Sequence, residues 1–424
     1  MQKENKRTAR NGVCVYSYKN PNVNSFYLSL FLRAGSMYED ESNRGMTHFL
    51  EHALIRNVNA VEGGKMYSLL DASGIEFNAS TYSEMVQFYV TGATKNFATA
   101  SALLLKLFSP IVLTSNEIRA ERDRIRAEIR ESDDRTSLSS FSSATVHSGS
   151  TLSHSILGTL SDISRVNAKR LEEYRKRAFT SENVFFYATG NYSDEDMDTF
   201  VSELGNIVLK AGEKRSNVAP VSQNFGKRVP KVYIKNADYT MLRFTFDMDM
   251  SELRFGVDDL LYDILLGGYS SRFFTELCVK RGLVYDLSGA VEKYRNIGSF
   301  FFTFEVKRGL VYEAVSLVLD ILTELKNTLL SSSACMKAGY VDNGKMLIDD
   351  ARETNFTFAY DNHIMNAGYS SVEERSMLYE CITPEMIREA ARAIFRPENM
   401  TLTMKGDKNK IDISRLENIL AAFK

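Results

Sequence analysis

Residues 167–190 read NAKRLEEYRKRAFTSENVFFYATG, and residues 383–406 read TPEMIREAARAIFRPENMTLTMKG. Each segment begins with a helical pattern that ends in Phe. Two further residues and Glu-Asn follow, and the segment then continues as a strand-like stretch that ends in glycine. The second copy follows the first at a constant offset of 216 residues, without a gap. Asn167 and Thr383 stand where a helix N-cap is expected. The repeat predicts two copies of one structural unit.

A second pair of segments supports the duplication. Residues 25–32 (SFYLSLFL) and 240–246 (TMLRFTF) both show the alternation of side chains that is typical of a strand. Both are followed by a helical pattern. We therefore expect an α+β fold made of two homologous α/β-sandwich domains, each with a mostly antiparallel sheet covered by helices. The domains are predicted to span 1–210 and 231–424, and the polar stretch 211–230 is predicted to be the linker.

The composition narrows the class of protein. The 424 residues carry 44% hydrophobic and 25% charged side chains and a net charge of −2. These values are typical of a globular protein, and they give no electrostatic case for a nucleic acid or an anionic membrane as partner. The polar first ten residues and the absence of a long apolar run favour neither a signal peptide nor a membrane span. Four widely spaced cysteines predict free thiols, and hence a cytoplasmic protein.

The candidate metal-binding and catalytic residues are concentrated in residues 44–55, which read RGMTHFLEHALI. On a helix, His48 and His52 share one face with Glu51 beside them, and the apolar residues lie on the other side. HxxEH is a signature of zinc peptidases, the reverse of HExxH. A catalytic zinc also needs a third protein ligand and a position left open for water.

Residues 116–132, NEIRAERDRIRAEIRES, supply a candidate third ligand. The segment is predicted to be a helix with an apolar stripe. Glu121 and Glu128 lie seven residues apart at the border of that stripe, whereas Glu131 points away. Carboxylates beside a core-facing stripe are costly unless they are paired or bound to metal. An arginine-paired surface helix is the alternative, since arginines stand close by, at Arg119, Arg122, Arg124 and Arg126.

Together these segments resemble the pitrilysin family of zinc metallopeptidases, which contains insulin-degrading enzyme and the mitochondrial processing peptidases. The family's pattern places a glutamate 76 residues after the second histidine of HxxEH, and Glu128 stands there. It also places an acid seven residues earlier, at Glu121. Further matches extend over nearly the whole chain: Asn11-Gly12, Ala34-Gly35-Ser36 with Glu39, Gly45, FNAST at 77–81, ILGT at 156–159, SSRFF at 270–274 and RGLVY at 281–285.

The resemblance implies a specific site. His48, His52 and Glu128 would hold one Zn²⁺ per chain, and Glu121 would support a ligand histidine from behind. Glu51 would accept a proton from the attacking water and pass it to the leaving amine.

The resemblance also implies where a peptide binds. The substrate would add to segment 77–81 as an extra strand, with Asn78 and Ala79 making the contacts. A plain buried strand is the alternative for this segment.

The second half departs from this pattern. Its counterpart to the HxxEH helix, residues 255–268, offers Asp259, Tyr262 and Asp263 in place of ligands. One metal site per chain is therefore expected.

A further departure concerns substrate anchoring. Active family members place an arginine seven residues before the tyrosine of GLxY. Here Tyr285 is present and is predicted to take part in catalysis, but position 278 is cysteine. Lys280 and Arg281 are near, but at positions that point elsewhere on a helix. The resemblance therefore implies that the chain is half of a clamshell. It would act with a related subunit as a heterodimer, or as a homodimer.

Three functions follow as hypotheses. The leading one is a zinc endopeptidase that hydrolyses peptides or small unfolded polypeptides through zinc-activated water. The second is a non-catalytic scaffold subunit of the same family. The third is a zinc-dependent protein that binds peptides without cleaving them.

Overall fold

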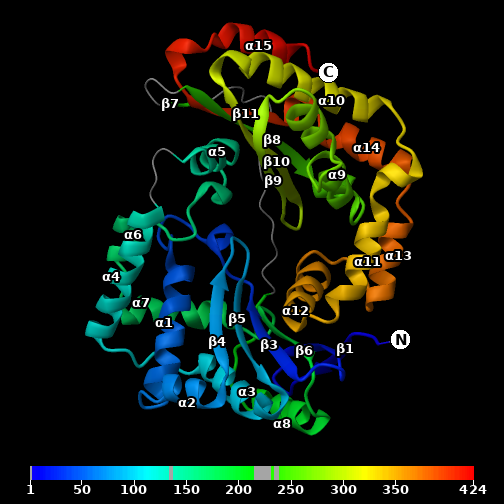
Figure 1. The fold of residues 1–424 in the computed structure, drawn as a ribbon. Helices are drawn as coiled ribbons and strands as arrows, with labels where there is room; N and C mark the ends of the chain where they lie inside the picture. Colours follow the sequence, from blue (N-terminus) through cyan, green and yellow to red (C-terminus); the bar gives the residue numbers. More distant parts are fainter. Residues whose placement is uncertain (1, 133–136, 214–230, 234–237) are drawn as a thin grey trace. The chain divides into compact units, whose positions relative to one another are not determined.

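The computed structural model describes residues 2–132, 137–213, 231–233 and 238–424. The chain divides into two compact units, each with mixed helices and strands (Figure 1). The first comprises Met1–Asp133, His154–Asn217 and Gly344–Val372; the second comprises Asp134–Ser153, Val218–Asn343 and Glu373–Lys424. Most of the predicted linker, 214–230, lies outside the described residues, so that boundary stays a prediction.

The first unit contains an open six-stranded sheet in the order β1-β2-β6-β3-β5-β4. Neighbouring strands are antiparallel except β2 and β6, which are parallel. Strand β4 forms one edge of this sheet. The strands span Asn5–Thr8 (β1), Cys14–Lys19 (β2), Ser25–Leu32 (β3), Glu76–Thr81 (β4), Val86–Ala93 (β5) and Val184–Gly190 (β6).

The second unit repeats this topology. Its sheet has the order β7-β11-β8-β10-β9, with β7 and β11 parallel and the other pairs antiparallel. This is the order β2-β6-β3-β5-β4 of the first unit, so the predicted duplication is confirmed and β9 is the counterpart of β4. The strands span Lys231–Tyr233 (β7), Tyr239–Asp249 (β8), Val284–Lys293 (β9), Ile297–Lys307 (β10) and Met400–Gly406 (β11).

The two repeated segments fold alike, as predicted. Helix α7 (Ala168–Ala178) leads into β6, and helix α14 (Pro384–Ile394) leads into β11. The side chains of Asn167 and Thr383 accept hydrogen bonds from main-chain amides in the first turn of each helix, and so cap its N-terminus.

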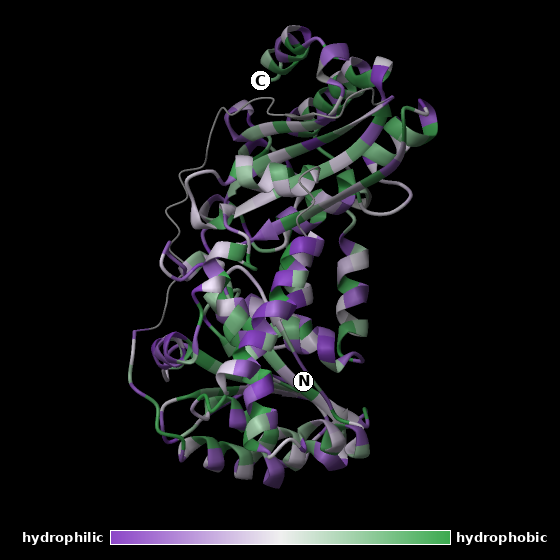
Figure 2. Cartoon of the chain, turned by 90° about the vertical axis from the view of Figure 1, so that its left-hand side faces the viewer, coloured by the Kyte–Doolittle hydropathy of each residue, from purple (hydrophilic) through white to green (hydrophobic). Residues whose placement is uncertain are grey.

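In the first unit, one face of the sheet shares a hydrophobic core with the helices. Leu28, Leu30 and Phe186 come from the strands, and Phe49 and Leu104 from helices. Hydrophobic and hydrophilic bands alternate along the helices in Figure 2, as amphipathic packing requires. The helices are α1 (Met46–Val61), α2 (Met66–Ser73), α3 (Phe97–Leu105), α4 (Ser115–Ser132), α6 (Leu160–Ser164), α7 and α8 (Asp194–Gly205).

The opposite face of this sheet is covered by a segment from late in the chain. Helix α12 (Ala351–Ala359) lies against β3 and β6 (Figure 1). His363 of the following helical segment η9 (Tyr360–Ile364) packs on Tyr16 of β2 and Phe185 of β6. Buried Asn355 donates to the carbonyls of Tyr27 and Tyr187, at 3.2 and 2.8 Å, and accepts from Ser29 at 2.7 Å. A polar interface therefore holds this segment in place.

The second unit contains the reverse exchange, since α5 (Leu138–Val146) lies against β8 and β11. Its remaining helices include α9 (Val257–Leu265), α10 (Val311–Asn327), α11 (Lys337–Leu347), α13 (Val372–Glu380), α14 and α15 (Ile413–Ala421). All four cysteines are free thiols, as predicted. Among the described residues, none of the helices combines the length and the apolar character needed to cross a membrane.

Candidate metal centre

The start of helix α1 is fixed by two residues that precede the histidines. Gly45 has a φ of 71°, and a Cβ at this position would lie 2.7 Å from the carbonyl oxygen of Leu157. Only glycine fits such a close approach in a left-handed conformation. The buried carboxylate of Glu39 accepts hydrogen bonds from the amides of Gly45 and Thr47, at 2.8 and 2.7 Å. The first turn, which carries His48, is therefore tied down on two sides.

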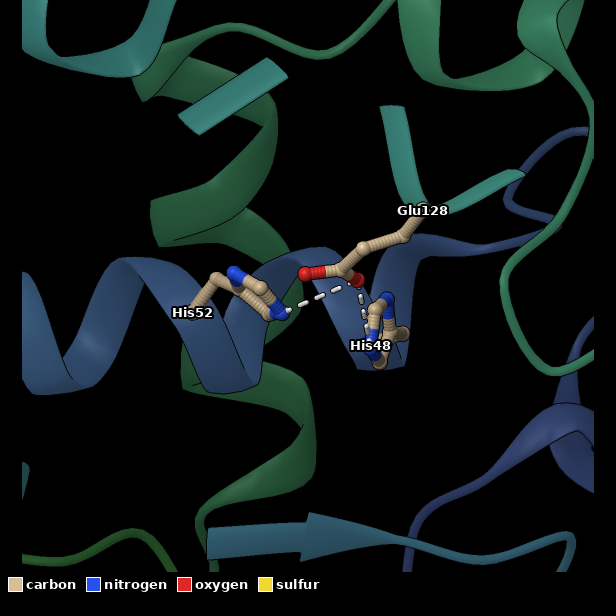
Figure 3. Close-up of side chains that lie close together, drawn as sticks. All are labelled: His48, His52 and Glu128. Carbon is tan, nitrogen blue, oxygen red and sulfur yellow. Dashed lines mark ion pairs between the residues drawn. The ribbon is translucent and has the colours of Figure 1, made fainter. Parts of the chain in front are cut away.

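Helix α1 packs its apolar side into the core and turns its polar side toward α4. Phe49, Leu50 and Ala53 are buried in the core of the first unit. His48 and His52 project from the other side, toward Glu128 of α4 (Figure 3). The predicted polarity of both helices is therefore confirmed.

The three predicted ligands converge. Glu128 Oε2 lies 3.8 Å from His48 Nε2 and 3.6 Å from His52 Nε2, and one ligand atom from each residue falls within 4.8 Å of the others. Bonds of about 2.0–2.2 Å to a tetrahedral zinc place neighbouring ligand atoms about 3.4 Å apart. The donor set and its spacing are therefore compatible with a zinc site.

A second carboxylate supports this cluster from the side. Glu121 Oε2 lies 3.3 Å from His52 Nδ1, and Arg56 donates to Glu121 Oε1. Burial acts to raise the pKa of Glu121, but the hydrogen bonds from His52 and Arg56 outweigh it, so the pKa is lowered. An ionised Glu121 orients the His52 ring with Nε2 toward Glu128. The sequence analysis missed Arg56, although its spacing of four residues from His52 places both on one helix face.

The protonation state of His48 also suits a ligand. Burial, together with the nearby His52, lowers the pKa of His48 to about 4. His48 is therefore neutral near pH 7, as an imidazole must be to bind a metal ion.

Glu51 lies beside the cluster but is held separately. Its side chain is 8% exposed, and its Oε2 accepts a hydrogen bond of 2.7 Å from the hydroxyl of Thr81 on β4. Burial raises the pKa of Glu51, although the hydrogen bond from Thr81 and the charge of His52 act in the opposite direction. A carboxylate whose pKa is raised binds a proton more tightly than a carboxylate of ordinary pKa, and it is therefore a better general base.

A cavity of about 730 Å³ opens over these groups. It is lined by the cluster, by Ile156 and Leu157, and by residues 77–81 of β4. Strand β4 pairs with β5 along one side, with Asn78 opposite Tyr89 and Ala79 opposite Phe88, and in the described structure no strand pairs with its other side. An open strand edge beside these candidate metal ligands can accept an extended peptide.

Tyr285 lies in the second unit, at the start of β9, and its side chain is 99% exposed. Cys278 belongs to the helical segment η6 (Phe274–Lys280). The basic residues that flank it are in surface ion pairs: Lys280 lies 2.6 Å from Glu276, and Arg281 3.5 Å from Glu313. The catalytic role of Tyr285 stays a prediction.

The second unit carries an ion pair on α9, the counterpart of α1. Lys293 Nζ lies 2.6 Å from both Asp258 Oδ2 and Asp259 Oδ1, and the hydroxyl of Tyr379 donates to Asp259 at 2.9 Å. Lys293 thus stands between the two adjacent carboxylates of Asp258 and Asp259.

Comparison with known families identifies the group to which these features belong. A family model described as Insulinase (Peptidase family M16) matches residues 14–160, and one described as Peptidase M16 inactive domain matches residues 165–335. The chain belongs to peptidase family M16. The first match contains the HxxEH helix and Glu128, and the second contains α9 and Lys293.

Relatives and solved structures agree with this assignment. An uncharacterized zinc protease of Rickettsia bellii is 27% identical over 295 residues, which cover 69% of this chain and 70% of the relative. A protease from Helicobacter pylori shares the M16 fold with a TM-score of 0.82 at 16% identity, over 96% of this chain and 100% of that one. The periplasmic protease PqqL from Escherichia coli matches with a TM-score of 0.81 at 16% identity. The match covers 100% of this chain and 50% of PqqL.

Proposed function

We propose that this M16 chain is a zinc-dependent endopeptidase that hydrolyses peptides or small unfolded polypeptides. The observation that carries the proposal is the convergence of His48, His52 and Glu128, with buried Glu51 beside them at the wall of a cavity. A structural ion pair would not require two adjacent imidazoles and a separately held carboxylate in one cavity.

Each residue has a distinct role. His48, His52 and Glu128 would hold one Zn²⁺, which as a Lewis acid lowers the pKa of water and polarises a carbonyl group. Glu51 accepts the proton of the attacking water and delivers it to the amine that leaves. Glu121 accepts a hydrogen bond from His52 Nδ1 and so keeps Nε2 available as the ligand atom.

Strand β4 would bind the substrate. A peptide added along its open edge pairs with the main chain at Asn78 and Ala79, next to Glu51 and the metal ligands. Main-chain pairing gives affinity with little demand on side chains, so we expect tolerance of sequence and a preference for extended or unfolded substrates.

A second M16 chain would complete the enzyme. The present chain spans half of the E. coli protease PqqL, and it has Cys278 where the resemblance to active pitrilysin-type peptidases implies an arginine. We therefore propose that it acts as the metal-carrying subunit of a heterodimer, or as a homodimer, and that it works in the cytoplasm.

The test is the substitution Glu51→Gln. Hydrolysis of a quenched fluorescent peptide library should fall by about 10²–10⁴-fold, because the general base is lost, and the bound zinc should stay. The assay is run on the purified chain and on its complex with any M16 subunit that co-purifies. Unchanged hydrolysis in the variant would refute the role of Glu51. Zinc-dependent peptide binding without any cleavage by the wild-type protein would favour the peptide-binding alternative.

A further inference from the structure

Thr81 connects the strand that would bind substrate with the carboxylate that would accept the proton. It is the last residue of β4, and its hydroxyl donates to Glu51 Oε2 at 2.7 Å. The bond crosses from the sheet to helix α1. It occupies one of the two carboxylate oxygens, Oε2.

The main chain around Thr81 is anchored. Thr81 pairs with Val86 of β5, and the Tyr82 amide donates to the Met85 carbonyl at 2.8 Å, which closes the hairpin. The Met37 amide donates to the Ser83 carbonyl at 2.9 Å and ties the turn to the segment before α1. A β-branched side chain has few rotamers, so a Thr81 hydroxyl on this backbone is held at one place.

Glu51 needs such an anchor. A glutamate side chain has three rotatable bonds, and a general base must lie within hydrogen-bonding distance of the proton it accepts. The aliphatic part of the side chain gives little directional control, whereas a short hydrogen bond to a carboxylate gives both energy and direction.

We propose that Thr81 is a positioning residue that fixes the carboxylate of Glu51, and that peptide pairing along β4 and orientation of the base are coupled through this one side chain. The proposal rests on the endopeptidase function proposed above. Residues 78–81 and Glu51 line the same cavity, so a peptide paired with β4 lies along the strand whose last residue holds the base. One strand thereby places both the substrate and the catalytic group.

The experiment compares Thr81→Val, which keeps the shape and removes the hydroxyl, with Thr81→Ser, which keeps the hydroxyl. We expect kcat to fall about 10- to 100-fold in Thr81→Val with KM unchanged within about twofold, as for the loss of a hydrogen bond to a charged group. Thr81→Ser should retain kcat within about threefold. Zinc content and Tm should match the wild type in both variants.

Thr91→Val is the matched control. Its hydroxyl donates to the Phe26 carbonyl, in the same sheet but outside the cavity, so kcat should be unchanged. Crystal structures of the metal-free variants add a readout without activity, with the Glu51 side chain ordered in Thr81→Ser and disordered in Thr81→Val.

The outcomes separate this proposal from the proposed function. Active wild type with an unchanged kcat in Thr81→Val would overturn the positioning role and leave the endopeptidase function standing. A raised KM with unchanged kcat would assign Thr81 to substrate binding instead and also overturn it. Equal losses of kcat in the Val and Ser variants, with lowered Tm, would mean a structural role. Absence of hydrolysis by the wild type, both alone and in complex with a co-purifying M16 subunit, would refute both proposals. The predicted loss of kcat in Thr81→Val and its retention in Thr81→Ser would support both.

Discussion

Glu84 should make the first unit less stable at neutral pH than at acidic pH. This residue, in the turn between β4 and β5, is 2% exposed. Oε1 accepts a hydrogen bond of 2.5 Å from Tyr360 of η9, and Oε2 has no hydrogen-bond partner in the described part of the chain. Burial raises the pKa of Glu84 from 4.5 to about 7, although the Tyr360 hydroxyl and the charge of Arg33 act against it.

The sign of the effect follows from linkage. A carboxyl group whose pKa is higher in the folded than in the unfolded chain stabilises the fold below the unfolded pKa. That contribution is lost as pH rises through the folded pKa. At about 1.4 kcal/mol per tenfold change in proton affinity, a pKa of about 7 instead of 4.5 corresponds to about 3 kcal/mol.

The perturbation is Glu84→Gln, which removes the charge and keeps the shape. Relative to the wild type, the variant should gain about 3 kcal/mol in the free energy of unfolding between pH 4.5 and pH 8. Urea unfolding followed by circular dichroism at several pH values, with equal zinc content, measures this gain. Glu195→Gln, at an exposed site on α8, serves as the control for carboxyl removal. A difference between Glu84→Gln and wild type that does not change with pH would refute the reasoning.

Two further substitutions test other parts of the structure. Lys293→Met should destabilise the second unit by about 3–5 kcal/mol in urea unfolding, because it leaves the carboxylates of Asp258 and Asp259 without their shared cation. The control Lys280→Met removes an exposed ion pair with Glu276 and should lower the free energy of unfolding by less than about 1 kcal/mol. Equal losses of stability in Lys293→Met and Lys280→Met would show that the Lys293 ion pair is not buried in solution. Glu121→Gln should weaken zinc binding about 10- to 100-fold in a competition titration with a chelator, because His52 loses its charged partner. An unchanged zinc affinity in Glu121→Gln would exclude a role of Glu121 in supporting His52 as a ligand.

Much of the site could be predicted because local periodicity fixes it. Residues four apart on a helix share a face, which placed His48 beside His52. Residues seven apart do the same, which placed Glu121 and Glu128 on the side of α4 that faces α1. The repeat of helix, Glu-Asn and strand likewise predicted α7 with β6 and α14 with β11, since caps and alternation are local signals.

The exchange of segments between the two sequence halves could not be predicted in this way. Helix α12 is held on the first sheet by Asn355, whose partners Ser29, Tyr27 and Tyr187 lie more than 160 residues away in sequence. No periodicity encodes such a contact. The Thr81–Glu51 hydrogen bond was missed for a related reason, because it joins a strand to a helix whose relative placement only the fold determines.

The central claim is that His48, His52 and Glu128 form a zinc site, and the zinc content of the purified chain tests it most directly. Elemental analysis under metal-replete conditions should find about one zinc per chain in the wild type and a small fraction of that in Glu128→Gln, because two imidazoles alone bind weakly. Glu131→Gln, at an exposed position of the same helix, should keep its zinc. A folded wild-type protein without zinc, or a Glu128→Gln variant that binds zinc as well as the wild type, would contradict the account.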